Sequence, residues 1–137
     1  MPPTVMLSYN IPGAGRGGKL VAAGPQPKPV LQPNDALQVQ VRWAGNPNGR
    51  PDSLQGVVVI TPMNGSSQST ASPFVDAATG RVACLMVNTV QGDNGVYTFP
   101  AMVYMGGRPG QFELTFVAAD TTTDTMWSVD PEFDTGS

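Results

Sequence analysis

The residue types that most often perform catalysis are scarce in this chain. It contains no histidine and one cysteine, Cys84. Histidine is the commonest general base and metal ligand, and one cysteine allows neither an internal disulfide nor a cysteine-based zinc site. Ser8, Ser53 and the Ser66–Ser69 cluster have no histidine to activate them as nucleophiles. We therefore expect no enzyme activity, no catalytic residues, no metal and no cofactor.

Two short motifs still carry side chains or backbone suited to ligands. Asp93-Asn94-Gly95 offers oxygen atoms that suit calcium, but the same three residues are typical of a tight hairpin turn. The glycine-rich run from Gly13 to Gly18 loosely resembles a phosphate loop. It lacks the Gly-Lys-Ser/Thr ending. We interpret Asp93-Asn94-Gly95 as a turn and the run from Gly13 to Gly18 as part of a flexible arm.

Four aromatic residues lie close together in the second half of the chain. Such residues can form a flat platform for a sugar, or they can fill a core and pair across strands. Cys84, within an expected strand, is interpreted as a small buried apolar residue. The four aromatic residues are Tyr97, Phe99, Phe112 and Phe116.

Composition indicates a soluble chain with a neutral, turn-rich surface. Of 137 residues, 40% are hydrophobic and only 12% charged, with 16 glycines and 14 prolines. That content supports one modest core. The net charge of −3 argues against nucleic-acid binding. We see no signal peptide and no apolar run of membrane-spanning length, so we expect no membrane partner.

Period-two patterns predict an all-β fold. Apolar and polar residues alternate from Leu37 to Trp43 and from Phe112 to Phe116, and Gly56–Thr61 is an apolar run of strand length. Turn residues separate these segments, and no segment has sustained helical periodicity. About seven short strands of this kind fit an immunoglobulin-like β-sandwich. The residues that we expect in its core include Trp43, Val59, Leu85, Leu114 and Phe116, with Val82 and Val87 as further candidates.

A stretch near the end of the expected sandwich resembles a known type of domain. Residues 93–99, DNGVYTF, and 106–116, GGRPGQFELTF, resemble the closing strands of bacterial Ig-like domains. Such domains occur as repeats in invasin-type surface proteins and as modules on phage virions. The resemblance implies an Ig-like sandwich and says little about function.

Both ends of the chain are rich in residues that disfavour independent packing. We therefore divide the chain into an N-terminal arm (1–34), an Ig-like sandwich (35–119) and an acidic C-terminal tail (120–137). The arm carries only basic charges and the tail only acidic ones, namely Asp120, Asp124, Asp130, Glu132 and Asp134. We expect both to become ordered only on a partner, through Met6, Leu7, Tyr9, Ile11, Arg16, Lys19, Lys28, Trp127 and Phe133.

These features together favour a structural role over an enzymatic one. We expect a decoration or cement protein of a viral (phage) capsid, located on the virion and assembled in the host cytoplasm. Its partners would be the major capsid protein, another virion protein or further copies of itself. The alternative is an Ig-like binding module of an adhesin or phage tail that recognises carbohydrate or a cell-surface protein. Opposite charges on the two terminal segments would serve either role.

Overall fold

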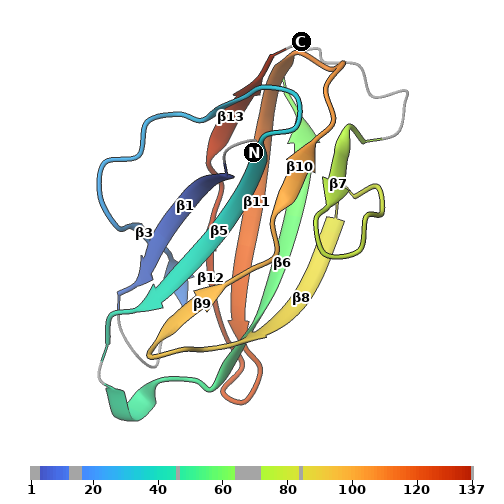
Figure 1. The fold of residues 1–137 in the computed structure, drawn as a ribbon. Coiled ribbons are helices and arrows are strands. Elements are labelled where there is room, and N and C mark those ends of the chain that lie inside the picture. Colours follow the sequence, from blue (N-terminus) through green and yellow to red (C-terminus); the bar gives the residue numbers. More distant parts are fainter. Residues whose placement is uncertain (1–3, 13–16, 46, 64–71, 84, 137) are drawn as a thin grey trace.

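The protein folds into two β-sheets that pack face to face, as in a β-sandwich (Figure 1). The computed structural model describes residues 4–12, 17–45, 47–63, 72–83 and 85–136. Sheet A contains β1 (Thr4–Ile11), β3 (Val21–Ala22), β5 (Ala36–Trp43), β7 (Phe74–Asp76), β9 (Val96–Thr98) and β10 (Met102–Tyr104). Sheet B contains β2 (Gly18–Lys19), β4 (Val30–Leu31), β6 (Ser53–Pro62), β8 (Leu85–Gln91), β11 (Gly110–Asp120), β12 (Thr125–Val129) and β13 (Glu132–Thr135). The all-β expectation is confirmed.

Within each sheet, one long strand organises the others. In sheet A, β5 lies between β1 on one side and β9 and β10 on the other. In sheet B, β11 pairs along one side with β6 and along the other with β12 and β13, and β8 adds to the far side of β6. A single 3-10 turn, η1 (Pro47–Gly49), interrupts the described strands at one end of the sandwich (Figure 1). The described residues include no helix long and apolar enough to cross a membrane.

The core lies between the two sheets and follows the period of two. Along β11, the alternate residues from Phe112 to Ala118 are buried, and the residues between them are half-buried. Rings from the two sheets meet edge to face. The ring centroids of Phe99 and Phe116 are 5.1 Å apart, and those of Phe74 and Phe112 are 5.3 Å apart. Such pairs contribute beyond their buried area.

The expected core is confirmed in part. Trp43, Leu114 and Phe116 are buried. The expectation that Leu85 is buried is wrong, because 58% of this residue is exposed. Val59 is only half-buried. In both strands the buried residue is the neighbour, Met86 in β8 and Val58 in β6. A shift of one residue moves a side chain to the opposite face.

Val82 and Val87 are also exposed, at 63% and 54%, so these further core candidates are wrong as well. Cys84 lies outside the described residues.

The expected hairpin at residues 93–96 is present. Asp93 and Val96 form an antiparallel bridge, and the two residues between them have left-handed backbones, with φ of 53° at Asn94 and 82° at Gly95. Asn and Gly adopt this conformation at the least cost, which explains their presence here. The turn therefore accounts for these residues without a bound ion.

The two terminal segments belong to the sheets, and this corrects the expected division of the chain. Strand β1 pairs in parallel with β5 over its full length, from Thr4 opposite Ala36 to Ile11 opposite Trp43. Strands β12 and β13 pair with β11. Residues 1–34 are thus not a separate arm in their described part, and residues 120–136 are not a separate tail. Pairing with a long strand offsets the ordering entropy that these segments could not offset alone.

Candidate functional site

Most of the apolar residues expected to bind a partner lie in the core. Leu7, Tyr9 and Ile11 point inward from β1 and are no more than 5% exposed. Burial raises the pKa of the Tyr9 hydroxyl. These residues have no surface to offer because strand alternation directs them between the sheets. Met6 points the other way and is 40% exposed.

The two apolar residues of the C-terminal segment are buried in the same way. Trp127 packs edge to face on Trp43 at a centroid distance of 6.1 Å, and Phe133 stacks on Phe112 at 5.7 Å. Their expected contact with a partner is therefore corrected to contact with the protein's own core. Of the expected basic residues, Lys19 and Lys28 are exposed, and Arg16 lies outside the described residues.

The oppositely charged ends of the chain meet one another. Lys28 Nζ lies 3.3 Å from Asp134 Oδ1, and nearby β4 pairs in parallel with β13. A second short strand, β2, pairs with β12. Within the described residues, one basic side chain of the N-terminal segment and one acidic side chain of the C-terminal segment therefore pair within the same chain.

Asp120 has a structural role at the end of β11. Its carboxylate accepts hydrogen bonds from the Thr122 amide and from the hydroxyls of Thr122 and Thr123, at 2.7 to 3.1 Å. Burial acts to raise the pKa of Asp120, but these bonds outweigh it and hold the pKa below its ordinary value. The acid closes the turn between β11 and β12.

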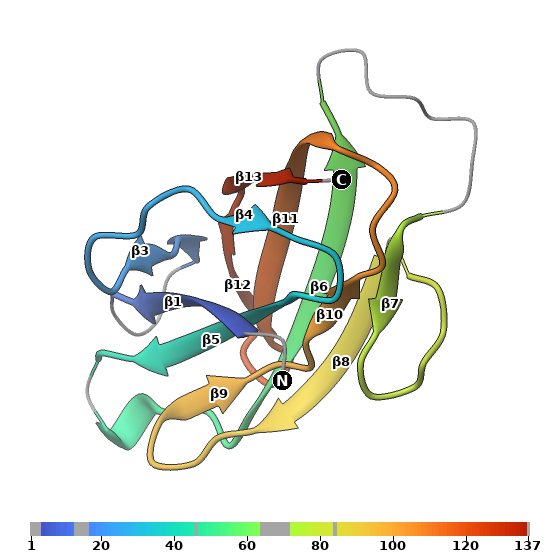
Figure 2. The same cartoon turned by 45° about the horizontal axis from the view of Figure 1, so that its top comes forward.

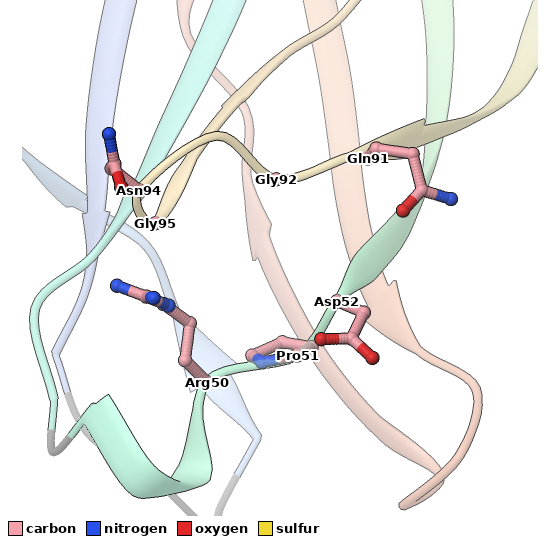
Figure 3. A pocket seen from close by; sticks show the side chains of 7 residues that line it. All are labelled: Arg50, Pro51, Asp52, Gln91, Gly92, Asn94 and Gly95. Atoms are coloured by element: carbon pink, nitrogen blue, oxygen red, sulfur yellow. The ribbon is translucent and has the colours of Figure 1, made fainter.

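A polar pocket of about 240 Å³ lies at the η1 end of the sandwich (Figure 3). Arg50 and Asp52 come from the segment that leads into β6, Gln91 is the last residue of β8, and Asn94 comes from the turn that joins β8 to β9. A backbone hydrogen bond of 2.8 Å from the Gly92 amide to the Asp52 carbonyl ties the two segments together. The pocket brings one cation, one anion and two amides to the same opening.

A buried tyrosine contacts one residue of the pocket lining. The Tyr97 hydroxyl donates a hydrogen bond to the Pro51 carbonyl. Burial raises the pKa of Tyr97; the nearby Arg50 charge opposes this, while Asp120 and Asp52 add to it. The pocket can offer hydrogen bonds and charges to a small polar ligand. It contains no nucleophile with a base beside it.

An open groove of about 480 Å³ lies along β1 and the segment before β13. Its lining includes Tyr9, Gln26, Lys28, Asp130 and Glu132. Gln26 is already engaged, because its side chain exchanges hydrogen bonds of 3.1 and 2.9 Å with the backbone of Ser8. The groove therefore lies where the N-terminal segment packs against the two sheets.

The outer surface of sheet B is the feature that the sequence did not predict. Val57 lies opposite Val87 on one side and Val117 on the other, and Val59 lies opposite Leu85. Leu85 and Val87 are 58% and 54% exposed, and the other three are half-buried. We call this set the apolar face: Val57, Val59, Leu85, Val87 and Val117.

The corresponding surface of sheet A is polar. Ser8, Gln38, Gln40 and Arg42 occupy its centre. Gln40 donates to the Thr98 hydroxyl at 3.0 Å, and Gln38 donates to the Phe99 carbonyl at 2.9 Å. One signal in the sequence distinguishes the two sheets: the unbroken runs Gly56–Thr61 and Leu85–Val87 place apolar residues on both faces of their strands.

The other motifs have structural roles in the part of the chain that the structure describes. Tyr97, Phe99, Phe112 and Phe116 are all buried, so they form no sugar platform. No group of three acidic or other metal-binding side chains is gathered within the residues that the structure describes. The central part of the glycine-rich run, residues 13–16, lies outside them.

Neither protein-family models nor curated protein sequences give a match to this chain.

Proposed function

We propose that this protein is a structural accessory protein that binds and stabilises a viral capsid, as a phage decoration protein does. The observation that supports a binding role is the apolar face of sheet B. A contiguous exposed apolar patch marks a surface that contacts another molecule. On this proposal the partner is the major capsid protein or another virion protein, and the protein resides on the virion.

The chemistry of the face favours a protein partner. All five residues of the apolar face are aliphatic, so they have nothing to offer a phosphate backbone or an anionic lipid head group. The protein also carries a net charge of −3. An uncharged aliphatic surface suits the apolar centre of a protein–protein interface. The low charge content of 12% is in keeping with a place in a crowded assembly.

The immunoglobulin-like class is part of the same proposal. Residues 93–116 form a hairpin turn, the short strands β9 and β10, a glycine turn and the long strand β11, and this order of elements supports the proposal. The alternative is an Ig-like module that recognises carbohydrate or a cell-surface protein. The polar pocket with Arg50 and Asp52 favours this second candidate, because recognition sites often lie on the loops at one end of a sandwich.

The test is binding to purified particles that have been stripped of the protein. Leu85→Lys places a charge in the centre of the proposed contact, and we expect it to weaken binding by about tenfold or more. Met105→Lys is the matched control, since it adds the same charge at an exposed apolar residue directly after β10 of sheet A. Met105→Lys should bind like the wild type.

The outcomes separate the two candidates. If Leu85→Lys binds the particle as tightly as Met105→Lys does, the apolar face is not the contact. If neither variant affects binding and Arg50→Ala abolishes it, the polar pocket is the contact and the second candidate stands. Circular dichroism of each variant shows whether the fold is retained.

A further inference from the structure

Within the residues that the structure describes, strand β8 has one side without a strand partner. Its seven residues pair with β6, from Leu85 opposite Val59 to Gln91 opposite Ser53. No further strand pairs with it in the described part of the chain, and Figure 2 shows it at the rim of sheet B. An open strand edge presents a row of unpaired N–H and C=O groups to any extended segment that approaches it.

The other long edges of the sandwich are each covered over part of their length. Strand β1 is covered at Ser8 by Gln26 and at Tyr9 and Asn10 by β3. In sheet B, β12 is covered in part by β2, and β13 by β4. Strand β9, which pairs with β5, is only three residues long.

Strand β8 also lacks the features that keep an edge from pairing. Its sequence, LMVNTVQ, contains no charged residue and no proline. Lysine, proline and bulges are the usual protection of exposed edges. Leu85 and Val87, on its outer face, are more than half exposed. The edge is therefore open both to backbone pairing and to apolar contact.

We propose that β8 pairs antiparallel with β8 of a second copy of this chain, so that the protein is a twofold-symmetric dimer. Antiparallel pairing of a strand with itself is the closed, isologous arrangement. If all seven residues pair, Asn88 lies on the twofold axis. Met86 then lies opposite Val90 of the second copy on the core side, and Val87 lies opposite Thr89 on the outer side.

The side chains match in this register. Met86 is buried and Val90 is partly buried against the core, so their pairing extends the core across the interface. Asn88 lies opposite Asn88 of the second copy, and a side-chain amide can both donate a hydrogen bond to another amide and accept one from it. The two apolar faces then join into one surface across the dimer.

The charges at the two ends of β8 select a second copy over an unrelated strand. Arg81 precedes β8 and Asp93 follows it. Among the described residues, neither side chain has an ion-pair partner within its own chain. Antiparallel pairing brings Arg81 of each copy toward Asp93 of the other, so opposite charges meet at both ends of the interface.

The test is the oligomeric state of the full chain in solution, measured by sedimentation over a series of concentrations. We expect a species of twice the 14.3 kDa mass of the chain. Thr89→Lys should shift the equilibrium to monomer, since it places two like charges beside the twofold axis. Arg42→Glu, on the outer face of sheet A, should leave the dimer unchanged.

A charge-reversal experiment tests the register and the partner. Arg81→Glu and Asp93→Arg each place like charges at both ends, and each should raise the dimer dissociation constant roughly tenfold. A mixture of the two variants should form a heterodimer, because every end contact is again attractive. A wild-type monomer at all concentrations, a dimer that persists in Thr89→Lys, or a mixture that stays monomeric would each overturn the proposal. Particle binding is not needed for this test, so its outcome is independent of the proposed function.

Discussion

The two sides of sheet B end very differently. On one side, β12 and β13 are followed by the short strands β2 and β4, and Lys28 pairs with Asp134 at 3.3 Å. On the other side, β8 ends the sheet with an uncharged, exposed edge (Figure 2). The first side is closed by the chain itself, and the second is open to another molecule.

The difference shows that exposure depends on the face to which a side chain points as much as on residue type. Trp127 in β12 is 2% exposed, whereas Leu85 in β8 is 58% exposed. Trp127 faces sheet A and Leu85 faces solvent. Segments rich in proline and glycine close one side of the sheet, and a valine- and leucine-rich strand is left open. The open side is therefore where partners are expected.

The largest expected effect compares the same substitution on the two faces of sheet B. Leu114→Ala removes a fully buried side chain and should reduce the free energy of unfolding by roughly 2–5 kcal/mol. Leu85→Ala, on the apolar face, should change it by no more than about 0.5 kcal/mol in the monomer. Urea unfolding of both variants, under conditions in which each is monomeric, measures the difference. Equal losses would show that Leu85 is covered and that β8 is not open.

A smaller effect is expected where the backbone of β6 lies directly against a ring from the opposite sheet. Gly56 points inward from β6, and a Cβ atom at this position would overlap the ring of Phe99 from the opposite sheet. Gly56→Ala should therefore cost roughly 1–3 kcal/mol of stability, because the core must shift to accept it. Gly24→Ala is the control, since its Cβ would meet open space. If Gly56→Ala unfolds at the same urea concentration as Gly24→Ala, β6 does not face Phe99 as described.

Sequence reasoning predicted the strands well because alternation and turn residues are local signals. The strand from Leu37 to Trp43, the Asn94-Gly95 turn and the buried face of β11 all depend on residues within a few positions of one another. The terminal segments could not be placed in this way. Strand β1 is held by β5, whose paired residues lie 32 positions further along the chain, and β13 is held by a strand and a salt bridge from the N-terminal segment.

Local sequence patterns also could not predict which face of β6 and which face of β8 is buried. Their runs are apolar at successive positions, so no alternation distinguishes Val58 from Val59 or Met86 from Leu85. Only the position of the opposite sheet decides which residue is buried. The polar pocket was missed for a similar reason, because Arg50 and Asn94 are brought together by two loops that are distant in sequence.

The smallest expected effect tests how the closed side is held. Lys28→Ala removes the ion pair with Asp134, in which both side chains are partly exposed, and should cost at most about 1 kcal/mol. The loss should shrink as salt is added, because screening weakens an exposed pair. Lys19→Ala, in β2 of the same N-terminal segment, is the matched control and should show no salt-dependent loss. A loss that is large and independent of salt would mean that Lys28 acts through packing of its aliphatic stem against the groove residues beside Tyr9.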